Sequence, residues 1–168
     1  MEKLVGVLSP IWIESLHRIC RQRAQFGDVP IAAACVDRVT HGVEYAGNQV
    51  EQTHNPLAHA ECVAIHQMSG IKKSRYLTDV ILISSVEPCT MCMGALAHAR
   101  IPGLIYFCQD EKDGYFTRHG VMVSETVLSQ VRIGTHPFWV RHAPEYAEPF
   151  QQLLTDFFKP KRSESNSQ

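Results

Sequence analysis

The chain has no long hydrophobic run and almost no net charge. Its 168 residues carry 16 Lys and Arg against 17 Asp and Glu, a formal net charge of −1. No stretch approaches the roughly 20 apolar residues that span a bilayer, so no membrane partner is expected. A near-neutral balance also gives no general attraction to a polyanion, so any nucleic-acid contact must come from a local basic patch.

Signals for export and for a disulfide scaffold are also missing. The apolar run from Leu4 to Ile13 is interrupted by Pro10, and no small-residue cleavage site follows it. Six cysteines in 168 residues are too sparse for a disulfide-stapled fold. We therefore expect a cytoplasmic protein with one globular domain, residues 1–158, and a basic and polar tail, 159–168, that is disordered.

Two short motifs hold the residue types that bind zinc. The first is His59-Ala60-Glu61, and the second, thirty residues further on, is Pro88-Cys89-Thr90-Met91-Cys92. One histidine and two cysteines make three zinc ligands, which leave the fourth tetrahedral position open for water or substrate. The pattern predicts one Zn²⁺ per chain, held by His59, Cys89 and Cys92 in a catalytic site.

Glu61 follows the histidine ligand at a spacing that favours a catalytic role. On a regular helix, side chains two positions apart point in directions that differ by about 200°. This argues against Glu61 as a fourth ligand beside His59. Its carboxylate would instead accept a proton as zinc-bound hydroxide attacks an amidine-like carbon. It would then pass protons to the ring nitrogen and to the amine, which leaves as ammonia.

Other readings of the motifs remain open. A structural zinc site or a redox pair would use Cys62 as the nearby fourth thiol. A non-catalytic zinc module that positions tRNA for another deaminase is a further alternative. Glu61 argues against such a module, because a domain that only folds around zinc needs no base beside an open position.

Periodicity predicts a layered α/β domain. Ser9-Pro10 opens a helix that Gly27 ends. Strands are predicted at 31–36, 43–50, 80–86 and 104–108. Further helices are predicted at 60–68, 89–100, 122–130 and about 145–158. Ligands in such sheets gather at the carboxyl ends of strands, where helices begin, and both motifs lie at predicted helix starts.

From about residue 27 to residue 162 the chain resembles bacterial tRNA-specific adenosine deaminases, of the cytidine and deoxycytidylate deaminase superfamily. The matching segments are Asp28-Val29-Pro30, Asn48, residues 54–61 and 87–92, Asp110, and the closing Asp156-Phe157-Phe158. The resemblance implies a three-layer α/β/α cytidine-deaminase-like fold with a five-stranded mixed sheet, and a homodimer. It also implies zinc on the three ligands, with Glu61 as proton shuttle.

The substrate is predicted less directly. We expect substrate contacts from Asn48, Ala60, Pro88, Asp110 and Phe138. The aromatic pair Phe138-Trp139 is available to stack on a flipped base or to close a lid over a small one. Two features depart from the family: an alanine stands at position 32 in place of the usual glycine, and residues 135–142 lack the usual asparagines. Free-base deaminases, including guanine deaminase, share the zinc motif. We favour adenosine to inosine in tRNA, with guanine or another small base as the alternative.

Overall fold

The computed structural model describes residues 8–123, 129–133 and 136–165. The elements in chain order are α2 (Pro10–Gln25), β1 (Ala32–Asp37), β2 (Val43–Gly47), α3 (Val50–Thr53), α4 (Ala60–Lys72), β3 (Val80–Val86), α5 (Thr90–His98), β4 (Gly103–Cys108), α6 (Tyr115–Arg118), β5 (Ser129–Ile133), β6 (His136–His142), the 3-10 turn η1 (Pro144–Tyr146) and α7 (Glu148–Ser165). In the described part of the chain, no helix is long and apolar enough to cross a membrane.

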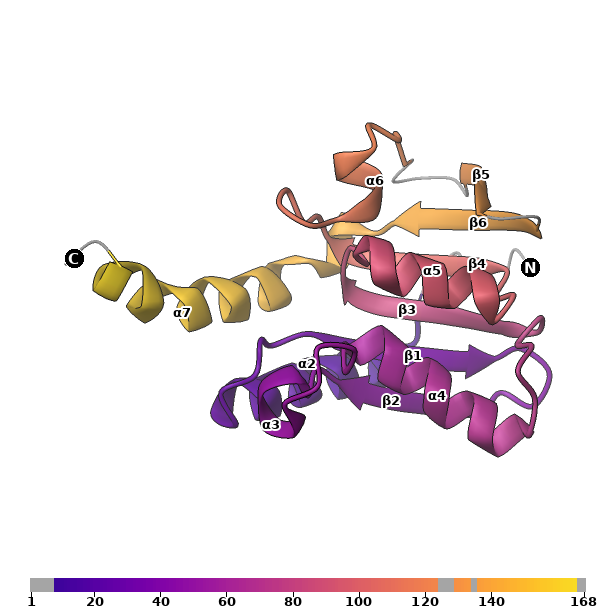
Figure 1. Ribbon diagram of the computed structural model, residues 1–168, viewed down its shortest axis with the longest axis horizontal. Helices are drawn as coiled ribbons and strands as arrows, with labels where there is room; N and C mark the ends of the chain where they lie inside the picture. Colours follow the sequence, from indigo (N-terminus) through magenta and orange to yellow (C-terminus); the bar gives the residue numbers. More distant parts are fainter. Residues whose placement is uncertain (1–7, 124–128, 134–135, 166–168) are drawn as a thin grey trace.

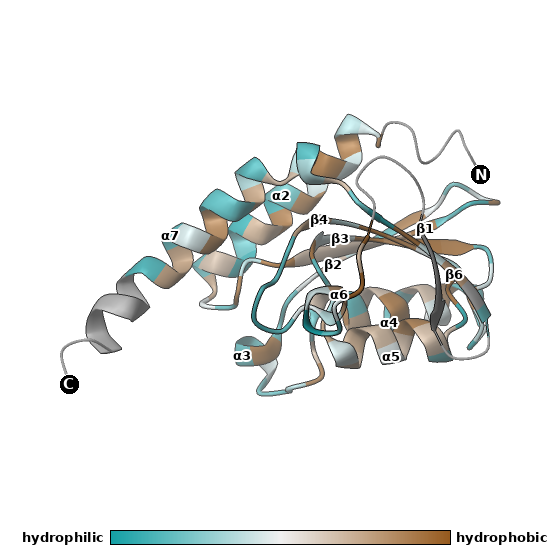
Figure 2. Ribbon diagram, turned by 90° about the horizontal axis from the view of Figure 1, so that it is seen from above, coloured by the Kyte–Doolittle hydropathy of each residue, from teal (hydrophilic) through white to brown (hydrophobic). Residues whose placement is uncertain are grey.

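The strands form one mixed sheet in the order β2-β1-β3-β4-β6-β5. The pairs β3–β4 and β4–β6 are parallel, while β1–β2, β1–β3 and β5–β6 are antiparallel. Helices α4 and α5 cover one face of the sheet, and α2 and α7 cover the other (Figures 1 and 2). The predicted three-layer α/β/α architecture is confirmed.

The sheet has six strands where the resemblance implied five. The sixth, β5, pairs antiparallel with β6 at the edge of the sheet. The sequence predicted a helix over 122–130, but Ser129 and Gln130 belong to this strand, and residues 124–128 lie outside the described part. Within this strand, Gln130 to Ile133 alternate polar and apolar residues, a period typical of a strand.

Strand alternation divides the core into two clusters. Ala33 and Leu82 pack with residues of α4 and α5, whereas Ala32, Ile81 and Ile83 pack with residues of α2 and α7. All five are fully buried. The central strands are therefore apolar on both faces, as expected for a sheet covered by helices on each side.

Two element boundaries differ from the prediction. Strand β2 ends at Gly47 and not at Val50, because Val50 begins α3. Helix α7 continues to Ser165, so residues 159–165, predicted as part of a disordered tail, are helical. The preceding turns of α7 supply the helix nucleus, so the segment only has to extend an existing helix, although it contains Pro160.

A partly buried ion-pair network lies where β1 ends. Lys72 Nζ lies 2.7 Å from Asp37 Oδ2 and 2.8 Å from Asp79 Oδ2. The backbone N–H groups of Val39 and Thr40 donate to Asp37 Oδ1. Burial raises the pKa of Asp37, but the hydrogen bonds from Lys72 and the two N–H groups outweigh it and hold the pKa well below its ordinary value.

Replacing Asp37 with asparagine is expected to lower the free energy of unfolding by about 1–3 kcal/mol at pH 7. Because the folded-state pKa is depressed, the carboxylate stabilises the fold fully above its unfolded pKa of about 4 and loses this effect as the pH falls further. Urea unfolding of both proteins between pH 7 and pH 3 measures the difference, which should shrink toward acid. A constant difference would contradict the assignment.

Candidate active site

The two zinc-ligand motifs meet because each begins a helix on the same face of the sheet. His59 is the N-cap residue of α4, and Cys89 is the N-cap residue of α5, both with extended backbone. The two helices flank β3, with α4 immediately before it in the chain and α5 immediately after it (Figure 1). Their first turns therefore lie at the end of the sheet where β3 ends, as the sequence predicted.

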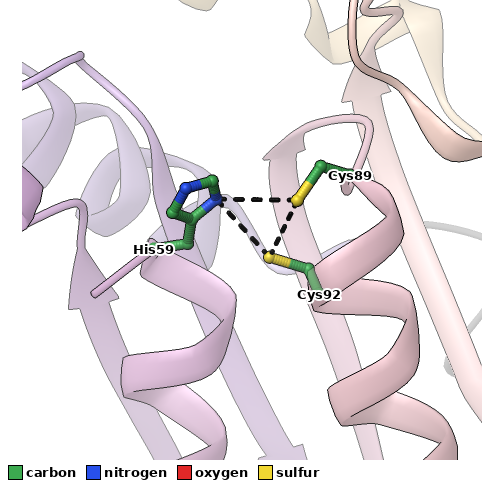
Figure 3. A group of neighbouring side chains, drawn as sticks. All are labelled: His59, Cys89 and Cys92. Carbon is green, nitrogen blue, oxygen red and sulfur yellow. Dashed lines mark hydrogen bonds between the residues drawn. The ribbon is translucent and has the colours of Figure 1, made fainter. Parts of the chain in front are cut away.

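The three predicted ligands form a nearly equilateral triangle. His59 Nδ1 lies 3.7 Å from Cys89 Sγ and 3.7 Å from Cys92 Sγ, and the two sulfurs are 3.7 Å apart (Figure 3). With Zn–S near 2.3 Å and Zn–N near 2.0 Å, a tetrahedral site has ligand–ligand edges of about 3.5–3.8 Å. The donor set and its spacing both fit one zinc ion.

A fourth protein ligand is not part of this group. Cys62 Sγ lies 3.9 Å from Cys92 Sγ. Among the described residues, however, the cluster whose ligand atoms all lie within 4.8 Å of one another contains only His59, Cys89 and Cys92. The arrangement matches a catalytic zinc site with an open position and gives no support to the closed structural site that would include Cys62.

The two thiols of the triangle differ in acidity. Hydrogen bonding to Cys92 and to His59 lowers the pKa of Cys89 to about 3, against the opposing effect of burial. The pKa of Cys92 is raised by its hydrogen bonds with Cys62 and Cys89 and by burial. A divalent cation bound to both sulfurs would stabilise both as thiolates.

Glu61 lies beside the triangle in the first turn of α4 and is 4% exposed. Its Oε2 lies 3.5 Å from Cys92 Sγ, and its Oε1 accepts a hydrogen bond of 3.2 Å from Ser84 Oγ. Burial raises the pKa of the Glu61 carboxyl. A buried carboxyl next to a metal position but outside the ligand set suits proton transfer.

A cavity of about 710 Å³ opens above these residues. His59, Glu61 and Cys89 line it, together with apolar side chains from the segment before β1, from α3, from the end of β3 and from α7. The remaining wall is the polar segment 109–113 that follows β4. The volume of the cavity suits a nucleobase with part of its attached sugar, since small-molecule sites occupy about 300–1,000 Å³.

Two of the predicted substrate contacts lie in this cavity. Asn48 lines it and is 5% exposed, with its Nδ2 3.4 Å from Asp28 Oδ1. Asp110 also lines it, and its Oδ1 accepts the backbone N–H groups of Lys112 and Asp113. Asn48 is therefore positioned by a buried carboxylate, whereas Asp110 shapes the turn of the wall.

The other predicted contacts are not among the lining residues. Phe138 is 3% exposed and packs in the core cluster on the α4 and α5 face, so it is not available to stack on a base. Ala60 is fully buried in the same cluster, and Pro88 is buried with its carbonyl accepting the N–H of Tyr115. Ala32 is not among the lining residues and is buried in the core cluster that includes residues of α2.

Sequence reasoning missed several buried polar residues around the site. Glu87 accepts hydrogen bonds from the N–H and Oγ1 of Thr117 and from the N–H of Asp110, which ties the cavity wall to the residue before Pro88. Ser84 donates to Glu61. The sequence indicates Ser84, because this serine interrupts the apolar strand 80–86. The strand pattern alone does not indicate that its partner is Glu61.

Comparison with known proteins gives a family. Residues 11–108 match the cytidine and deoxycytidylate deaminase zinc-binding region. A tRNA-specific adenosine deaminase of Aquifex aeolicus is 31% identical over 87% of this chain and 91% of its own length. Another, from Rickettsia felis, is 36% identical over 52% of this chain, and the match spans 61% of that relative.

Solved structures with the same fold are more distant in sequence. One, from a study of A-to-I editing by tRNA:A34 deaminases, has a TM-score of 0.72, 24% identity, and covers 87% of this chain and 100% of that one. Guanine deaminase from Nitrosomonas europaea has a TM-score of 0.70, 18% identity, and covers 90% and 85%. With its matched zinc-binding region and its His-Cys-Cys triangle, the chain belongs to the cytidine and deoxycytidylate deaminase family.

Proposed function

We propose that the chain is a zinc-dependent hydrolase that deaminates a nucleobase, converting adenosine to inosine in tRNA. The observation that carries this proposal is the open triangle of His59, Cys89 and Cys92 beside the buried Glu61. The names of the Aquifex and Rickettsia relatives support tRNA adenosine as the substrate. The cytoplasmic location expected from the sequence stays a prediction.

Zinc held by His59, Cys89 and Cys92 would supply a Lewis acid that acidifies water at the open position. Glu61 Oε2 would take a proton from that water and deliver it to the ring nitrogen. It would then carry the second proton to the amino group. One C–O bond forms and one C–N bond breaks, so base and water give the oxo base and ammonia.

A second candidate function is deamination of a free base such as guanine. The cavity wall carries the carboxylates of Glu51, Asp110, Glu111 and Asp113, and among the described lining residues Lys112 is the only cation. Carboxylates in the cavity wall repel the phosphates that flank a base in RNA. They would instead favour a neutral purine, whose amino and ring N–H groups donate hydrogen bonds.

The substrate is decided by product analysis. Zinc-loaded protein would be incubated with an anticodon stem-loop bearing wobble adenosine and, separately, with guanine, adenine, cytosine and their nucleosides. The proposal predicts inosine in the digested stem-loop. A stem-loop with guanosine at the wobble position is the matched control. Turnover of a free base with an unchanged stem-loop would overturn the tRNA assignment in favour of the second candidate.

We further expect a homodimer, as the family resemblance implies. Leu57, two residues before the ligand His59, is 61% exposed, and Ile71 on α4 is 60% exposed. Large exposed apolar side chains are candidates for burial by a second copy. Sedimentation equilibrium should give twice the chain mass of 18.9 kDa. A mass of one chain at micromolar concentration would contradict the expectation.

A further inference from the structure

We propose that Ser84 is a positioning residue for the proton shuttle. Its hydroxyl holds one oxygen of the Glu61 carboxylate, so that the other oxygen faces the zinc ligands. The inference rests on the proposed function, because it assigns a role in the same deamination. It concerns a residue of the apolar strand β3 that the zinc motifs do not include.

Strand geometry brings Ser84 to the catalytic side of the sheet. Successive residues of β3 point to opposite faces, so Ser84 shares with Leu82 the face covered by α4 and α5. Ser85 points the other way, where its Oγ accepts the N–H of Ala32 and contacts the thiol of Cys20. Neighbouring serines of one strand therefore have separate partners.

Burial makes the contact between Ser84 and Glu61 significant. Ser84 is fully buried and Glu61 is 4% exposed, so bulk water is not available to solvate either group. A hydroxyl in an apolar strand is costly unless it forms a hydrogen bond, and the bond from Ser84 Oγ to Glu61 Oε1 is 3.2 Å long. This one bond thus gives a hydrogen-bond partner to both the buried hydroxyl and one carboxylate oxygen.

The carboxylate is held between two different groups. Oε1 points to Ser84, and Oε2 lies 3.5 Å from the ligand sulfur of Cys92. Rotation about the last torsion of Glu61 would break the bond to Ser84 and turn Oε2 away from the zinc ligands. The hydroxyl therefore selects the orientation in which Oε2, and not Oε1, lies next to the zinc ligands.

This orientation matters because proton transfer depends on distance. A general base must approach its proton partner to about 2.6–3.2 Å between heavy atoms. A displacement of about 1 Å can cost about 100-fold in rate. Ser84 does not line the substrate cavity, and its hydroxyl donates to Glu61, so we expect it to act on kcat and not on substrate binding.

A purely structural role makes a different prediction. If Ser84 only satisfied a buried carboxylate, its removal would lower the free energy of unfolding and leave kcat unchanged. Ser85 provides the matched control, because Ser85→Ala removes the neighbouring buried hydroxyl on the opposite face. That variant should lose stability without a specific loss of kcat.

The test compares zinc-loaded wild type, Ser84→Ala, Ser84→Thr, Ser84→Val and Ser85→Ala on the substrate found for the wild type. We expect Ser84→Ala to lower kcat about 10- to 100-fold with KM unchanged. Zinc content should stay at one per chain. Ser84→Thr keeps a hydroxyl and should restore most of kcat, whereas Ser84→Val, of nearly equal shape, should not. If the alanine variant does not fold, the comparison of Ser84→Thr with Ser84→Val decides whether the hydroxyl contributes to kcat.

A crystal structure of zinc-loaded Ser84→Ala or, failing that, Ser84→Val gives a readout independent of turnover. It should show the Glu61 carboxylate rotated or in two orientations. Equal kcat in the threonine and valine variants at the wild-type level would overturn the inference and leave the proposed function standing. A wild type that deaminates no substrate would overturn the proposed function and this inference with it.

Discussion

Glu61→Ala is expected to abolish turnover while zinc stays bound. A positioned general acid–base contributes about 10²–10⁴ in rate, and here one carboxylate serves every proton transfer, so a loss of at least about 10³-fold in kcat is expected. The zinc triangle of His59, Cys89 and Cys92 does not include Glu61, so metal analysis should still find one zinc per chain. Ammonia release measures the rate.

Glu61→Gln is the matched control for shape. The amide has the size of the carboxylate and can still accept a hydrogen bond from Ser84, but it cannot accept and return a proton at neutral pH. It should be folded, zinc-loaded and as inactive as the alanine variant. Activity within tenfold of wild type in either variant would mean that another group moves the protons.

Cys92→Ala is expected to remove zinc and loosen the fold. Cys92 is a fully buried member of the triangle, so the remaining imidazole and thiolate cannot complete a stable site. Metal that binds only the folded chain stabilises it by about 4 kcal/mol when present at a thousand times its Kd. For a chain of this size that corresponds to a fall of about 8–16 °C in melting temperature.

The neighbouring thiol gives the control for this prediction. Cys62→Ala removes a sulfur 3.9 Å from Cys92 that lies outside the triangle, so it should keep one zinc per chain. Metal analysis and thermal unfolding with and without a chelator would be compared for both variants. Full zinc occupancy in Cys92→Ala, or loss of zinc in Cys62→Ala alone, would contradict the ligand assignment.

The zinc ligands could be predicted from sequence because local geometry determines them. Cys89 and Cys92 lie three residues apart at a helix start, which places both sulfurs on one side whatever the rest of the chain does. That His59 presents Nδ1 to the sulfurs could not be predicted, because it depends on how α4 and α5 are placed across β3.

Residues whose role depends on distant packing were predicted poorly. Phe138 resembled a stacking aromatic in sequence, but strand β6 directs it into the core. Strand β5 was missed although Gln130 to Ile133 alternate polar and apolar residues, because four alternating residues are a short pattern and the strand is defined by its pairing with β6. Ser84 looked like a minor interruption of an apolar strand, since its partner Glu61 lies on a different element.

The most direct test of the central claim is ammonia release by the zinc-loaded protein, with Glu61→Ala as the blank, across the stem-loop and the free bases together. The account predicts ammonia from at least one of these substrates with the wild type and none above background with the blank. No ammonia from any nucleobase with fully zinc-loaded protein would contradict it, and so would equal release by the two proteins.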